Sequence, residues 1–269
     1  MIRNLFSSAI LKSALGASAL LLSTTSAHAV VSTFATFTSL NSSKNISLVN
    51  AGPSGIGATV YSTSTDTATS AGVSKVQFSF IQPGISTYIN NVVADFTLNA
   101  NITKPLTEVD GTFTQPVFSG TMTFLSTTAI TFVGADSITQ TLAAGSNLLT
   151  LNFNAKISGD EFGSTATFGA STAAHNYNIT YTSDFLDFSS VINKDFSTSF
   201  TALTPALTKA ANGSLDSFRA TIGGQFSSDP APLIVSTVPE PASWALMVTG
   251  FMMLGVALRQ HRSTTVAAA

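Results

Sequence analysis

Cysteine is absent from this chain of 269 residues. The absence excludes disulfide frameworks, thiolate metal sites and cysteine nucleophiles together. The folded part must therefore be stabilised by its hydrophobic core alone. The chain is long enough to bury one core of ordinary size, and we expect a single folded body.

Charged residues are also scarce, at 9% of the chain, and the formal net charge is -2. Nucleic acids and anionic membrane surfaces are bound through clustered basic side chains, which this balance does not provide. We therefore expect no nucleic-acid partner and no partner bound through bulk charge.

The chain has only three histidines, and His175 alone lies outside the two terminal segments. One histidine cannot build a histidine-based zinc site, and the small polar segment 172–178 contains no serine-elbow motif. We expect His175 to be a solvated loop residue. We predict no catalytic residue, no metal ligand and no cofactor, and the body is not expected to be an enzyme.

Three acidic pairs could each offer oxygen ligands to a hard cation such as calcium. They are Glu108 with Asp110, Asp160 with Glu161, and Asp184 with Asp187. None has EF-hand spacing, and each lies beside turn residues or polar stretches, where carboxylates are commonly just solvated. A glycoside hydrolase would need two carboxylates about 5 to 10 Å apart in the fold, which sequence spacing alone does not show.

Residues 1–29 have the organisation of a secretory signal peptide. Arg3 and Lys12 supply a positive start, and the stretch Ser13–Leu22 is apolar or small. This stretch is too short to cross about 30 Å of hydrocarbon, but it has the length of a signal-peptide core. Ala27 and Ala29 are the small residues that signal peptidase requires, so cleavage after Ala29 is expected.

The C-terminal region has a different order of features. It begins at Pro239-Glu240-Pro241, and Trp244 follows near the start of the uncharged segment Ala242–Leu258. At 1.5 Å per residue a helix over this segment spans most of a bilayer core, with the tryptophan at the interface. Arg259 and Arg262 would stop transfer on the cytoplasmic side. We expect a single transmembrane helix over 242–258.

This tail resembles the PEP-CTERM sorting signal, in the variant in which Trp-Ala follows the Pro-Glu-Pro. The match covers residues 239–262, although the basic cluster is Arg259-Gln260-His261-Arg262 rather than a solid arginine run, and residues 263–269 follow as a cytoplasmic tail. The resemblance implies that an exosortase, a membrane-embedded cysteine transpeptidase, recognises Pro239, Glu240 and Pro241. It also implies a Gram-negative bacterium with exopolysaccharide gene clusters. An ordinary anchor that is never cut is the alternative.

The region between the two ends is patterned for β-structure. Twenty phenylalanines stand among Thr, Ser, Ala and Asn, and aromatic and β-branched residues favour strands. Apolar residues alternate with polar ones over 75–80, 94–102 and 149–157, which predicts strands with one face on a core. Weaker strand candidates surround Phe34 and Phe37, Met122 and Phe124, Ile130 and Phe132, Ala166 and Phe168, Tyr177, Ile179 and Tyr181, and Phe218–Ile222.

Turn residues separate these runs, for example Pro83-Gly84, Asp110-Gly111 and Asn212-Gly213. About ten strands at this spacing predict an all-β fold, an antiparallel β-sandwich or jelly-roll-like body over 30–226. A solenoid is less consistent because no fixed-length repeat is present. The segment 227–238, with Pro230 and Pro232, is predicted to be a linker.

Together these features predict an exported, non-enzymatic protein of the cell surface or extracellular matrix, associated with exopolysaccharide or biofilm. It would pass through an intermediate anchored in the inner membrane. One alternative is a binding module for glycan or ice. Thr-x-Thr pairs such as Thr63 with Thr65 and Thr121 with Thr123 occur, but flat threonine arrays are expected to need a regular repeat, which is missing. The other alternative is a secreted glycan-acting enzyme with a paired-carboxylate cleft.

Overall fold

The computed structural model describes residues 31–40, 43–53, 55–175, 177–236, 249 and 251–253. The described chain is almost entirely β-structure, which confirms the predicted all-β class. Its elements are β1 (Ser32–Ser39), β2 (Ile46–Asn50), β3 (Ala58–Ser62), β4 (Ser74–Phe80), β5 (Val92–Ile102), β6 (Thr107–Val109), β7 (Thr112–Ser126), β8 (Ile130–Val133), β9 (Thr139–Leu142), β10 (Asn147–Asp160), β11 (Ala166–Ser171), α1 (Thr172–His175), β12 (Ile179–Thr182), β13 (Leu186–Asp187), β14 (Asn193–Thr204), β15 (Phe218–Asp229) and β16 (Leu233–Ile234).

Most strands belong to one antiparallel sheet of 12 strands. Strand β15 pairs with β14 along one edge and with both β1 and β2 along the other edge. Strand β5 pairs with β7 along one edge and with both β3 and β4 along the other edge. Because β1 also pairs with β4, and β7 is linked to β14 through β10 and β11, the strands form a closed ring. Closure leaves few edges open to pairing with another chain.

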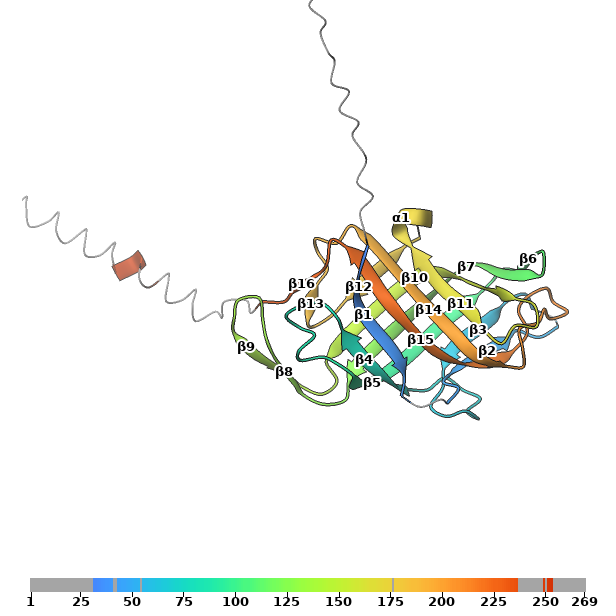
Figure 1. Ribbon diagram of the computed structural model, residues 1–269, viewed down its shortest axis with the longest axis horizontal. Helices are drawn as coiled ribbons and strands as arrows, with labels where there is room; N and C mark the ends of the chain where they lie inside the picture. Colours follow the sequence, from blue (N-terminus) through green and yellow to red (C-terminus); the bar gives the residue numbers. More distant parts are fainter. Residues whose placement is uncertain are drawn as a thin grey trace, which may run out of the picture.

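The closed sheet has two layers that face each other. Strands β1, β15, β14 and β11 form the near layer, with β5, β7 and β10 behind them (Figure 1). The sequence predicted a sandwich or jelly roll, in which separate sheets pack together. In the structure, hydrogen bonds join both layers into a single sheet.

Phenylalanine fills the space between the layers. The largest fully buried side chains are all phenylalanines, and Phe124 of β7 is at the centre of their contacts. Its ring centroid lies 4.8 Å from that of Phe37, 5.2 Å from that of Phe78 and 5.1 Å from that of Phe96. These distances are typical of favourable aromatic pairs. The predicted alternation is confirmed, because every apolar position of the three clearest runs faces this core.

The folded body extends beyond the predicted boundary at residue 226. Ser227, at the predicted start of the linker, lies within β15, which ends at Asp229, and β16 pairs with β13. The Gln82 side chain donates to the Pro232 carbonyl at 2.6 Å, and the backbone N–H of Val235 donates to Phe185 at 3.0 Å. The described part of the predicted linker is therefore attached to the body.

Candidate binding groove

The residues predicted to direct sorting lie outside the described part of the chain. These are the signal-peptidase site, the Pro-Glu-Pro motif with its tryptophan, and the two stop arginines, namely Ala27, Ala29, Pro239, Glu240, Pro241, Trp244, Arg259 and Arg262. Of the expected helix over 242–258, Thr249 and Phe251–Met253 are described, and they are helical and exposed. Within the described residues, no helix is long and apolar enough to cross a bilayer.

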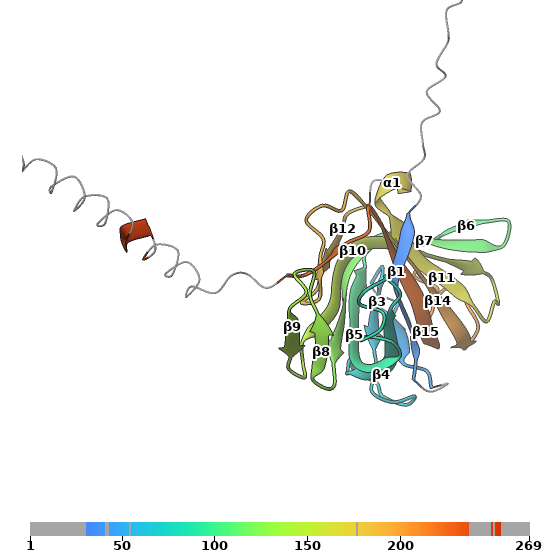
Figure 2. The same cartoon turned by 60° about the vertical axis from the view of Figure 1, so that its left-hand side comes forward.

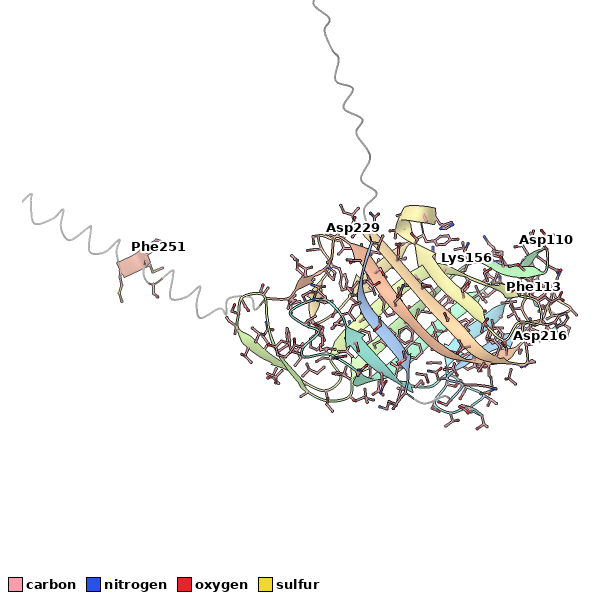
Figure 3. All side chains as sticks on the ribbon, in the orientation of Figure 1. Asp110, Phe113, Lys156, Asp216, Asp229 and Phe251 are labelled. Carbon is pink, nitrogen blue, oxygen red and sulfur yellow. The ribbon has the colours of Figure 1, made fainter. Side chains whose placement is uncertain are left out.

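Two members of the acidic pairs accept hydrogen bonds from the backbone of turns. Asp184 accepts a hydrogen bond from the backbone of Asn147 at 2.7 Å, and Asp187 accepts one from the backbone of Ser189 at 2.8 Å. Asp110 lies in the tight turn at the tip of the β6–β7 hairpin, which projects from the body (Figures 2 and 3). This turn lies beside the end of β10, because the backbone N–H of Glu161 donates to the carbonyl of Gly111. In the described part of the chain, no group of three or more His, Cys, Asp or Glu residues could hold a metal ion.

Three adjoining cavities hollow the outer face of the near layer. Their volumes are about 460, 700 and 520 Å³. The first and second share Ser197 and Gln225, and the first and third share Thr167. We call this continuous surface across β1, β15, β14 and β11 the groove. Hydroxyl and amide side chains dominate its lining, among them Ser158, Thr167, Ser197, Ser199, Thr221 and Gln225.

Glycine keeps the floor of the groove low. Gly169 of β11 pairs with Ser197 of β14 and faces outward, between Lys156 and Ser197 in the same row across the sheet. A Cβ atom at Gly169 would lie 2.7 Å from the carbonyl oxygen of Phe196, so the close approach of these two strands requires glycine. The backbone is therefore accessible to a ligand at this point.

His175 and Tyr177 form one wall of the first cavity. Their ring centroids are 5.2 Å apart and the rings are nearly parallel, at 16°. The expectation of a loop histidine is therefore incorrect in part: His175 is exposed, but it ends α1 and stacks on a tyrosine. The pair provides a flat aromatic surface beside hydroxyl groups, an arrangement that suits the apolar face of a sugar ring.

Asp195 of β14 lines the same cavity and carries an unsatisfied acceptor. Its Oδ1 atom is buried and has no hydrogen-bond partner. Nearby, the Tyr181 hydroxyl donates to the Asp195 backbone carbonyl at 2.5 Å. Burial, and to a lesser extent the charge of Asp195, raise the pKa of the Tyr181 phenol, so it remains a protonated donor. A buried acceptor without a donor costs roughly 1–3 kcal/mol.

Lys156 completes the polar lining of this cavity (Figure 3). The ion pairs among the described residues are Lys75 with Asp95 and Lys209 with Glu108, so the Lys156 ammonium is available to a ligand. Asp195 is the one carboxylate among the described residues that line the first cavity, and Asp160 the one in the third. A pair of carboxylates in one cavity, which the glycan-acting enzyme would require, is not found in the groove as described.

Sequence reasoning missed the groove because it depends on pairing between distant strands. The signals were present only as isolated residues: a lone Asp195, a lone tyrosine beside His175, and Ser-x-Ser or Thr-x-Thr spacing on several strands. Comparison with known proteins adds no relative, because no family model, no curated protein and no solved structure matches this chain.

Proposed function

We propose that this chain is an exported, non-enzymatic protein of the cell surface or extracellular matrix, and that its β body binds neutral polysaccharide in the groove. The observation that carries the binding proposal is the buried, unpartnered Oδ1 of Asp195 in a cavity with a stacked aromatic pair. A small rotation of the carboxylate would present this oxygen to the cavity, where a sugar hydroxyl could donate to it, and a carboxylate acceptor makes a strong hydrogen bond. The first cavity carries one positive and one negative side chain, Lys156 and Asp195, and this balance favours a ligand without net charge.

Export by the general secretory route is part of the same proposal. The body begins with β1 at Ser32, so cleavage after Ala29 would remove the leader and leave every described strand intact. We also propose that the tail is an exosortase-type sorting signal, with a membrane-anchored intermediate and later transfer to the envelope or matrix. This assignment rests on the resemblance of residues 239–262 to the PEP-CTERM signal, and exopolysaccharide is the partner that it implies.

The mature protein is expected to begin at Val30. Ala27 and Ala29 present the small side chains that signal peptidase binds, directly after an apolar run of suitable length. Mass spectrometry of the N-terminal peptide of exported protein measures this position. An exported protein that still begins at Met1 would contradict the signal-peptide assignment.

Asp195→Ala is expected to weaken binding of neutral polysaccharide by about 10-fold or more, since a hydrogen bond to a charged acceptor contributes roughly 1.5–3 kcal/mol. The variant should be at least as stable as the wild type, because it removes an unsatisfied buried acceptor. Tyr177→Ala should also weaken binding, through loss of the stacking surface. Affinity electrophoresis of the exported protein in gels containing dextran, mixed-linkage β-glucan or galactomannan measures these effects.

Glu161→Gln is the matched control, because Glu161 is exposed and does not line the cavity of Asp195. Its retardation, measured relative to its own migration in a gel without polysaccharide, should equal that of the wild type in every gel. A gel containing alginate tests the preference for neutral chains. If none of the neutral polysaccharides retards the wild type, or if all variants are retarded equally, the groove is not a glycan site.

A further inference from the structure

The outer face of the far layer carries a regular two-dimensional set of neutral polar side chains. It belongs to β5, β7, β10 and β12, on the side of the molecule opposite the groove (Figure 1). Residues that are directly opposite one another on these four strands form rows across the sheet. The first row consists of Thr97, Thr123, Thr150 and Thr182. The second row consists of Asn99, Thr121, Asn152 and Thr180.

We define these two rows as the polar array. Its residues alternate with core residues such as Leu98, Met122 and Leu151, so they face solvent, and all are partly or fully exposed. The pairing register runs through both rows without a bulge. Neighbours within a row are therefore about 4.8 Å apart, and the two rows are about 6.7 Å apart along each strand.

Hydrogen bonds between the side chains hold the array in place. Thr121 donates to the Oδ1 atom of Asn152 at 2.7 Å, and the Asn152 amide donates to the hydroxyl of Thr180 at 3.5 Å. In the first row, Thr150 is 3.4 Å from the hydroxyl of Thr123 and donates to Asn147 at 2.9 Å. Ordering these side chains in the free protein reduces the entropy lost when a surface binds.

The chemistry of the array excludes several kinds of partner. It contains no ionisable group, so a charged polymer or a charged protein surface is disfavoured. It contains no large apolar side chain, whereas the centre of a protein interface is apolar. It also lacks an aromatic ring on which a sugar could stack, unlike the groove. What remains is a regular lattice of hydroxyl, amide and methyl groups with two fixed spacings.

We propose that the polar array binds ice. Water molecules on an ice face occupy fixed, repeating positions on the same length scale as the two spacings of the array, and hydroxyls and amides can replace water in such a hydrogen-bonded layer. The sequence contains no threonine repeat, and on sequence alone this absence argues against ice binding. The fold supplies the regularity instead, because register places Thr97, Thr123, Thr150 and Thr182 in one row although they come from four different sequence contexts.

Ice recrystallisation inhibition by purified exported protein tests this proposal. The wild type is expected to keep ice grains small, and Thr121→Tyr, which places a bulky ring in the centre of the array, should raise the concentration needed by at least 10-fold. Thr131→Tyr is the matched control. Thr131 is an exposed strand residue on β8, outside both the array and the groove, and its variant should match the wild type.

Melting curves of all three proteins establish that the substitutions leave the body folded. Should Thr121→Tyr unfold, the smaller change Thr182→Val at the exposed end of the first row replaces it, with an expected loss of several-fold. Large ice grains with the wild type, or equal potency of the array variant and the control, would overturn the proposal. Retention of the wild type on microcrystalline cellulose that Thr121→Tyr abolishes would also overturn it, in favour of a crystalline polysaccharide. Neither result depends on Asp195, so the groove is tested separately.

Discussion

Replacing Phe124 by alanine is expected to lower the free energy of unfolding of the body by about 3–5 kcal/mol. Phe124 is fully buried, and its ring packs against those of Phe37, Phe78, Phe96 and Phe226. These partners come from four different strands in both layers. Removing the ring therefore leaves a cavity that no single side chain can refill. Total stabilities are commonly about 5–15 kcal/mol, so the loss is a large fraction of the whole.

Chemical denaturation of the mature protein, followed by fluorescence or circular dichroism, measures this loss. Phe162→Ala is the matched control, because Phe162 is 70% exposed and the same atoms are removed. We expect the control to change stability by less than about 1 kcal/mol. A loss of less than about 1 kcal/mol for Phe124→Ala would show that the aromatic core is not packed as described. The absence of cysteine makes the test direct, since no disulfide holds the layers together.

Alternation of apolar and polar residues was sufficient to predict much of the fold. The clearest runs correspond to β4, β5 and β10, and the weaker candidates correspond to β1, β7, β8, β11, β12 and β15, although Tyr177 precedes β12. Burial alternates over most of these strands, although β1 and β15 also contain consecutive buried residues, and side-chain type follows burial closely enough to be recognised.

Strand β14 was missed because one of its core positions is polar. Thr198 lies between Phe196 and Phe200 on the inward face and is buried, so the apolar alternation is interrupted. Its hydroxyl donates to the carbonyl of Phe168 at 2.8 Å, which removes most of the cost of burying it. A polar residue that finds a partner in another strand cannot be distinguished from a surface residue by sequence pattern alone.

Neither the closure of the sheet nor the two candidate surfaces could be predicted from the sequence, for a related reason. The ring is completed where β1 pairs with β15, and residues such as Thr36 and Gln225 come together from opposite ends of the body. Register between such distant strands is set by the packing of the entire core, and a shift of one residue would turn every side chain to the other face. The hydroxyl groups were visible in the sequence, but their arrangement in a groove and an array was not.

The largest effect that we expect on the fate of the protein comes from the tail. Glu240→Ala should block processing while leaving export intact, because an exosortase would recognise the Pro-Glu-Pro motif, whereas the predicted signal peptide would govern translocation. Unprocessed protein should remain in the inner membrane. The uncharged segment 242–258 favours the bilayer, and drawing Arg259 or Arg262 through its centre costs a few kcal/mol each. Release must therefore come from cleavage.

Fractionation of cells that express the protein with an epitope after Ala269 compares the two fates. The wild type should reach the envelope or medium without the epitope, while Glu240→Ala should stay full-length in the inner membrane. Ser243→Ala is the matched control, since it changes a small polar residue of the same tail outside the Pro-Glu-Pro motif, and it should behave like the wild type. If the wild type also stays full-length in the membrane, the tail is a permanent anchor. The cost of drawing the arginines through the bilayer applies equally to every uncut form. The groove and the array would then act at the outer face of the inner membrane rather than in a matrix released from the cell.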